Sequence, residues 1–141
     1  MRDPRHARRS LAALLLDQAF LAGLGNYLRS DILHATGIRH DTRPVDLDAA
    51  TTARLARNIL ALPRQSLRTH GTTNDPAMLR TLEARGIKPG ARRFRVYGRE
   101  GLPCWFCGRR IRRVNVGGRG VYYCPACQPE RVGECRTDKR P

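Results

Sequence analysis

Four cysteines in two pairs are the residues of this sequence with the clearest chemistry. Cys104 and Cys107 form one Cys-x-x-Cys pair, and Cys124 and Cys127 form a second. Each pair can bend back and point both sulfurs to one side, so two pairs supply four thiolates for one tetrahedral zinc ion. Sixteen residues separate the pairs, the length of a β-hairpin that joins them. Two disulfides or a redox pair are the alternatives, and the doubled spacing favours one structural Zn²⁺ ion.

The segment Val116–Gly120 is the expected tip of that hairpin. Its glycines permit a tight turn and a close approach of the backbone to a ligand, and Arg119 projects from the turn. Arg119 is either a nucleic-acid contact or an ordinary exposed arginine. The residues alone leave both interpretations open.

A second glycine-rich stretch, Gly23-Leu24-Gly25-Asn26, precedes an expected helix. Glycines ahead of a helix N-terminus expose backbone N–H groups, and the helix dipole favours an anion such as phosphate. Asn26 can give its side-chain amide to that phosphate or merely cap the helix. Taken alone, the residues favour the cap.

The charge balance points to a polyanionic partner. The 141 residues hold 27 Lys and Arg against 12 Asp and Glu, a net charge of +15. Residues 91–141 alone hold thirteen cations against four anions, so we expect salt-dependent binding of nucleic acid by the cysteine-rich end. No apolar run is long enough to cross a membrane, and reduced thiols suit the cytosol. No catalytic triad, phosphate loop or carboxylate pair stands out.

Periodicity and capping residues predict a mainly α fold that ends in a small β-hairpin. The expected helices cover residues 10 to about 20 with Ser10 as N-cap, 27–35 ended by Gly37, 49–63 with Asp48 as N-cap and a further turn possible to Leu67, and 76–84. Pro63 should kink or end the third helix, and Phe94–Tyr97 alternates like a short strand. The expected organisation is a basic lead-in at 1–9, a helical domain at 10–90, a four-cysteine zinc finger at 91–128 and a disordered basic tail at 129–141.

Two stretches resemble the formamidopyrimidine-DNA glycosylase and endonuclease VIII family. Leu14–Arg29 is similar to its helix–two-turn–helix motif, and Gly117–Gln128 is similar to its zinc-finger end. The sequence of residues 24–29, Leu-Gly-Asn-Tyr-Leu-Arg, favours the endonuclease VIII branch. Members of this family remove oxidised bases from DNA and cut the abasic strand, so the resemblance implies the DNA-binding half of a base-excision-repair glycosylase and lyase.

The resemblance also implies roles for individual residues. Asn26 and the amides of Gly23 and Gly25 would hold phosphates around the lesion, and Arg29 belongs to the same motif. Arg119 would contact phosphates beside a nucleotide flipped out of double-stranded DNA. The zinc ion would be structural.

The start of the sequence departs from the family pattern. Family members use an N-terminal proline followed by glutamate, whereas this sequence begins Met1-Arg2-Asp3-Pro4, where the proline nitrogen is an amide. We therefore expect the chain to bind DNA without cutting it efficiently, with the catalytic domain encoded upstream or supplied by a separate chain, in the cytoplasm at the nucleoid. A stand-alone, non-catalytic DNA-binding or damage-sensing module is the alternative. An RNA-binding zinc protein is a third interpretation, and it rests on charge alone.

Overall fold

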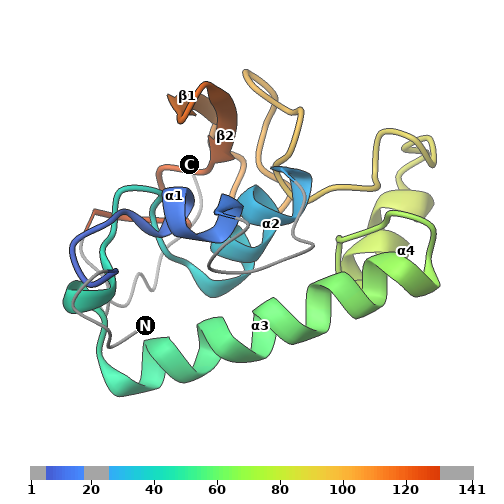
Figure 1. Cartoon of the computed structure of the whole chain (residues 1–141). Coiled ribbons are helices and arrows are strands. Elements are labelled where there is room, and N and C mark those ends of the chain that lie inside the picture. The colour runs from blue at the N-terminus through green and yellow to red at the C-terminus, as the bar shows by residue number, and fades with distance from the viewer. Residues whose placement is uncertain (1–5, 18–25, 131–141) are drawn as a thin grey trace.

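Four α-helices and one β-hairpin make up the computed structural model, which describes residues 6–17 and 26–130. The elements are α1 (Leu11–Leu16), α2 (Asn26–Thr36), the 3-10 turn η1 (Pro44–Asp46), α3 (Ala49–Arg68), α4 (Pro76–Ala84), β1 (Arg112–Val116) and β2 (Arg119–Tyr123). Helix α2 lies between the long helix α3 and the hairpin and packs against both (Figure 1). The predicted mainly α fold with a terminal hairpin is confirmed. No helix in the described ranges combines the length and apolarity needed to cross a membrane.

Helix α1 begins where the sequence predicts and ends earlier than predicted. The Oγ of Ser10 accepts a hydrogen bond from the amide of Ala13, so Ser10 is the N-cap. The helix ends at Leu16 because Asp17 adopts an extended conformation, with its carboxylate 2.8 Å from a guanidinium nitrogen of Arg9. Residues 18–25, which include Gly23 and Gly25, lie outside the described residues.

The predicted third and fourth helices form, and the third has the predicted cap. Asp48 accepts from the amide of Thr51 at 2.7 Å and begins α3. Helix α3 runs through Pro63 and ends at Arg68, so the further turn forms and the proline does not end the helix. Asp75 caps α4 in the same way, by accepting from the amide of Met78.

The main apolar core joins the helices to the hairpin. Leu15 of α1, Ile32 of α2 and Leu55 of α3 are fully buried in one cluster. Val121 of β2 is fully buried in the same cluster, although it comes from the cysteine-rich end of the chain. Burying one such side chain contributes about 1.5–3 kcal/mol, so the hairpin is held by apolar packing as well as by its metal centre.

The expected strand at Phe94–Tyr97 does not form; this segment consists of bends and turns. Its backbone donors bond to a side chain instead of a neighbouring strand. The carboxylate of Asp31 on α2 accepts from the amides of Arg95, Val96 and Tyr97 at 3.0–3.1 Å. Alternation of charged and apolar residues predicted the strand, but a buried carboxylate satisfies the N–H groups that a strand partner would have taken.

The hairpin has the predicted tip. Strands β1 and β2 are antiparallel, with Val116 paired to Arg119 across the two-residue turn Gly117-Gly118. The φ angles of these glycines are +62° and +78°, the left-handed conformation that a tight hairpin turn demands at both positions. The tip therefore needs glycine, and the turn places Arg119 at the start of β2.

Candidate metal centre and nucleic-acid interface

The sulfurs of Cys104, Cys107, Cys124 and Cys127 lie within 4.8 Å of one another. The Sγ atoms of Cys107 and Cys124 are 3.3 Å apart, and those of Cys104 and Cys127 are 3.9 Å apart. Zn–S bonds of about 2.3 Å put tetrahedral sulfurs about 3.8 Å apart. The spacing therefore fits one four-coordinate ion, and the predicted ligand set converges on a single site.

Each Cys-x-x-Cys pair is a tight turn in which the backbone supports a sulfur. The amide of Phe106 donates to the Sγ of Cys104, and the amide of Cys127 donates to the Sγ of Cys124, both at 3.4 Å. Such donors stabilise thiolates, the protonation state that binds metal. The two turns therefore prepare their sulfurs for a cation.

The electrostatics of the four sulfurs also call for a cation. Hydrogen bonds from Cys124 and then Cys127 lower the pKa of Cys104, so the neighbouring thiols stabilise one thiolate in the cluster. The same contacts with Cys104 raise the pKa of Cys124 to about 12 and raise the pKa of Cys127 as well. A second thiolate beside the first is unfavourable until a divalent ion compensates both. The residues thus fit a structural Zn²⁺ ion, with no coordination position left for water.

Two residues outside the cysteine pairs hold the centre to the helical part. His34 of α2 is buried, with its Nε2 3.7 Å from the Sγ of Cys104, and its Nδ1 accepts from the Nε of Arg95 at 3.0 Å. Gln128 accepts from the amide of Cys124 and donates to the carbonyl of Ile38, both at 2.8 Å. Sequence reasoning missed both roles. The position of Gln128 directly after Cys127 was the one available signal.

Asn26 is the first residue of α2 and faces the hairpin. Its Nδ2 donates to the carbonyl of Gly120 at 3.1 Å, and its Oδ1 accepts from Arg29 at 2.8 Å. One turn later, the hydroxyl of Ser30 accepts from the amide of Tyr122 at 3.1 Å. The N-terminal end of α2 is therefore bonded to β2 in two places, which brings together two stretches that the sequence places more than ninety residues apart.

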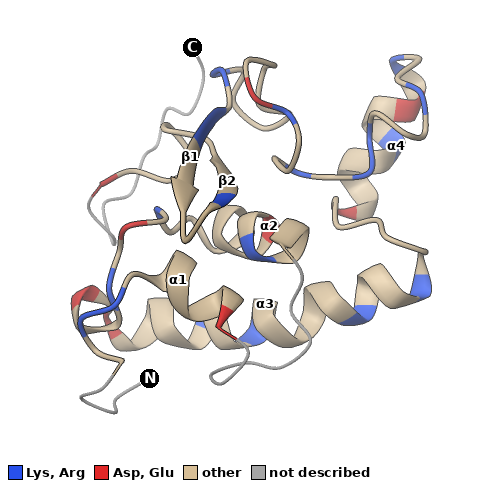
Figure 2. Ribbon diagram, turned by 45° about the horizontal axis from the view of Figure 1, so that its top comes forward, with Lys and Arg blue, Asp and Glu red and all other residues tan. Residues whose placement is uncertain are grey.

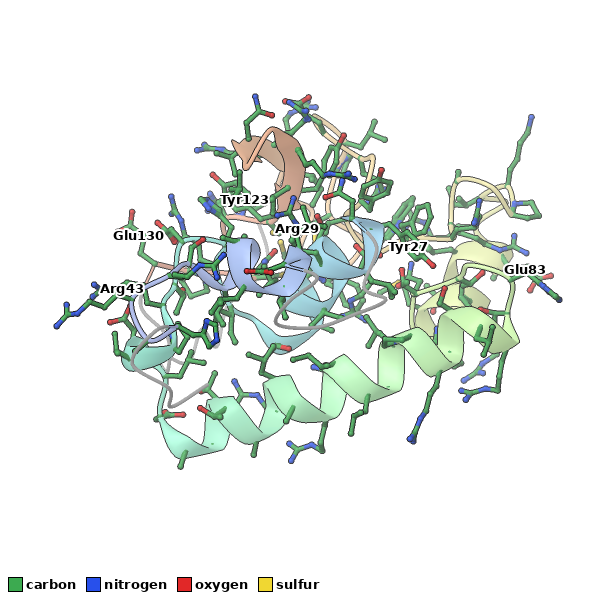
Figure 3. All side chains as sticks on the ribbon, viewed as in Figure 1. Tyr27, Arg29, Arg43, Glu83, Tyr123 and Glu130 are labelled. Carbon is green, nitrogen blue, oxygen red and sulfur yellow. The ribbon has the colours of Figure 1, made fainter. Side chains whose placement is uncertain are left out.

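Arg29 is fully buried between α1 and the hairpin (Figure 3). It donates to the carbonyl of Ala12 at 2.8 Å as well as to Asn26. Burial, and then the nearby charge of Arg119, lower the pKa of Arg29 to about 10. Its Nε is buried without a hydrogen-bond partner, and within the described residues neither Arg29 nor Arg119 forms a salt bridge. Two arginine charges therefore lie close together near Asn26, and no acidic side chain in the described part of the chain forms a salt bridge with either.

Arg119 itself is exposed beside the hairpin turn. Figure 2 shows basic positions on both strands of the hairpin and on α2 below it. The structure thus brings Asn26, Arg29 and Arg119 to one place, whereas Gly23 and Gly25 lie outside the described residues. The contact of these residues with DNA stays a prediction.

Comparisons with known proteins agree with this geometry. Residues 101–129 match the family described as the zinc finger found in FPG and IleRS. The sequence is 42% identical over 126 residues to proteins named Endonuclease 8 from Escherichia coli strains HS and K12 / DH10B. These alignments cover 89% of this chain and 44% of each relative, so the chain spans less than half the length of the curated relatives it matches.

Solved structures share the fold. A Lactococcus lactis Fpg in complex with DNA containing an abasic site aligns with a TM-score of 0.70 at 24% identity. A MutM in complex with DNA containing carbocyclic 8-oxo-G aligns with a TM-score of 0.70 at 25% identity. Both alignments cover 89% of this chain and 44% of the other.

Proposed function

We propose that this chain, a partial member of the formamidopyrimidine-DNA glycosylase and endonuclease VIII family, is the DNA-binding part of an endonuclease VIII-like repair enzyme. The observation that carries the proposal is the positive charge of Arg29 and Arg119 near Asn26, which no acidic side chain pairs with in residues 6–17 and 26–130. The positive charge of Arg119 is, after burial, a cause of the lowered pKa of Arg29, so an anion beside the exposed Arg119 stabilises both guanidinium groups. A DNA phosphate supplies that anion, and the structural neighbours bound to abasic or damaged DNA support this choice.

In this proposal the hairpin tip and the start of α2 act as one phosphate clamp. The hydrogen bonds from Asn26 to Gly120 and from Tyr122 to Ser30 fix the spacing of the two elements. Arg119 contacts a phosphate from the hairpin, while Asn26 and the amides of Gly23 and Gly25 contact phosphates at the start of α2. Arg29 donates a hydrogen bond to the Oδ1 of Asn26 and so fixes the orientation of that side chain. Such contacts set the position of the duplex and do not read its sequence.

The zinc ion has a structural role in this proposal, because four thiolates close its coordination shell. Base removal and strand cleavage are then assigned to the portion of the relatives that this chain does not cover, or to a separate chain that supplies it. Double-stranded DNA with an oxidised base or an abasic site is the proposed partner. The corresponding location is the bacterial cytoplasm at the nucleoid.

The proposal is tested by fluorescence anisotropy of the zinc-loaded chain with an abasic duplex, the intact duplex and a structured RNA across a salt series. We expect the abasic duplex to bind most tightly and the Arg119→Gln variant to bind it about ten-fold more weakly. The salt slope of that variant should fall by about one. Arg109→Gln is the control, since Arg109 is also an exposed arginine but lies directly after the first cysteine pair, before the strands of the hairpin.

Tighter binding of structured RNA, or equal losses in both variants, would overturn the phosphate clamp. Borohydride trapping on the same abasic duplex tests the catalytic assignment separately. A shift in the gel without a covalent adduct is expected, whereas a rapidly trapped adduct would place a competent amine in this chain. Binding without any preference for the abasic site would contradict damaged DNA as the partner.

A further inference from the structure

A second basic site lies at the opposite end of α3 from η1, between the end of α3, α4 and the loop that follows α4. A cleft there encloses about 470 Å³, and its lining includes Thr72, Arg80, Arg92 and Arg93. The acidic residue in its lining is Glu83, which Figure 3 shows at the α4 end of the molecule. None of these residues belongs to the clamp of Asn26, Arg29 and Arg119.

The turn that follows α3 lines this cleft, and its shape leaves room for the side chain of Arg93. His70 has a φ of +56° and Gly71 has a φ of +103°, so the chain after α3 passes through two left-handed residues. A Cβ at Gly71 would collide with the Nη2 of Arg93, and glycine therefore lets that guanidinium lie directly against the turn. Left-handed residues other than glycine are uncommon, and their strain is often retained at binding sites.

Two of the arginines that line the cleft, Arg92 and Arg93, are held in place by contacts within the chain. The main-chain carbonyl of Arg93 accepts from the amides of Thr73 and Asn74 at 3.0 and 3.1 Å. The guanidinium of Arg93 lies 4.9 Å from the centre of the Phe94 ring. The Nη1 of Arg92 donates to the carbonyl of Ile87 at 2.6 Å. These contacts fix the positions of both side chains and leave other N–H groups of each guanidinium for a ligand.

The charge of the cleft is not neutralised within the described residues. Arg80, Arg92 and Arg93 take part in none of the salt bridges found there, and Glu83 pairs with none of them. Three guanidinium groups facing one space form the arrangement that binds phosphate through parallel N–H donors. The volume of the cleft lies in the range of small-molecule sites and suits a group of mononucleotide size.

We propose that this cleft is a second anion site that binds a phosphate group. The phosphate belongs to a free nucleotide or to a nucleic-acid strand. The cleft is joined to the clamp by side-chain packing, because the guanidinium of Arg93 lies over the ring of Phe94, whose centre is 5.3 Å from that of Tyr27, the neighbour of Asn26 in the sequence. The strand source rests on the proposed function, whereas the cleft itself does not.

The test is an NMR titration of the full, zinc-loaded chain with inorganic phosphate, with thymidine 5′-monophosphate and with a single-stranded oligonucleotide. We expect the amide signals of residues 69–72 and 92–93 to move with all three probes. Arg80→Gln should weaken phosphate binding about ten-fold, because Arg80 is exposed and its loss removes one charged donor without disturbing the core. Arg80→Lys should recover part of the affinity by charge alone.

Arg85→Gln is the matched control, since Arg85 is an exposed arginine at the end of α4 that is not part of the cleft lining. Equal losses in Arg80→Gln and Arg85→Gln, or no shifts at residues 69–72 with inorganic phosphate, would overturn the proposal. Tighter binding of the mononucleotide than of the oligonucleotide identifies a free nucleotide as the source, and the reverse order identifies a strand. Arg119→Gln should leave phosphate binding at the cleft unchanged, which separates failure of this site from failure of the DNA clamp.

Discussion

The imidazole Nε2 of His34 lies 3.7 Å from the Sγ of Cys104, so α2 touches the metal centre directly. One turn earlier on the same helix, Asp31 accepts three backbone amides from the segment that leads into the finger. Ser30 adds a hydrogen bond to β2. The finger is therefore built on α2, and polar side chains inside that helix carry the attachment.

The first prediction concerns the contact between His34 and the metal ligand. His34→Phe keeps a ring against Phe106 but removes the nitrogen beside Cys104. Loss of such an outer contact typically lowers metal affinity about 10- to 100-fold. Competition with a chromophoric zinc chelator measures the change. His40→Phe is the control, because His40 stacks on Tyr123 and forms no hydrogen bond with a cysteine of the described residues. Matching zinc affinities in the two variants would refute a role for His34.

Asp31→Asn should destabilise the whole chain. The carboxylate is fully buried and accepts from Thr73 as well as from three backbone amides. In the variant, the NH₂ group of the asparagine would face N–H or O–H groups that also need an acceptor. We expect a loss of about 2–3 kcal/mol in the free energy of unfolding. Urea unfolding followed by circular dichroism measures it. Asp41→Asn removes an exposed partner of Arg39 and should cost less than about 1 kcal/mol.

Removal of zinc should unfold the finger. Chelation takes the ion away from its four sulfurs, and Cys124→Ser leaves the ion with three sulfur ligands, so both lose binding free energy that holds the finger folded. We expect loss of the hairpin signals in the NMR spectrum and loss of DNA affinity. Acid should act in the same direction, since the thiolates must take up protons as zinc leaves. An unchanged spectrum and affinity after complete zinc removal would contradict this prediction.

Gly118→Val should weaken DNA binding through the shape of the hairpin tip. The φ of Gly118 is +78°, and a β-branched residue in that conformation costs about 1–2 kcal/mol. The turn then shifts, and Arg119 moves with it. Anisotropy with the abasic duplex should show lower affinity at unchanged zinc content. Asn115→Val is the control on exposed β1, where a branched side chain suits the strand and affinity should stay close to that of the parent chain.

Local signals in the sequence predicted a large part of this structure. Asp48 is a helix cap whose partner lies three residues away, and the cysteine pairs are spaced for a hairpin, so neighbouring residues were sufficient. Asp31 and His34 could not be found in this way. A polar residue within a helix normally indicates a solvent-facing side, and its partners here are at least 42 residues away in the sequence.

The strand expected at Phe94–Tyr97 was wrong for the same reason. Alternation describes which side chains are buried, but it does not say what satisfies the backbone, and here a carboxylate from a distant helix does so. The end of α1 at Leu16 could not be predicted from the sequence either, because Gln, Ala and Leu continue a helical pattern after Asp17.

Val121 is fully buried against Leu15 and Ile32, so a residue from the zinc hairpin completes the interior of the helices. The finger is consequently not a portable module, and a fragment cut between the helices and the hairpin would open a hole in the remaining core. The concentration of free zinc then affects the stability of α1 and α2 against unfolding as well as that of the finger. Above the dissociation constant of the folded chain, each tenfold rise in free zinc should add about 1.4 kcal/mol to the stability of both parts together.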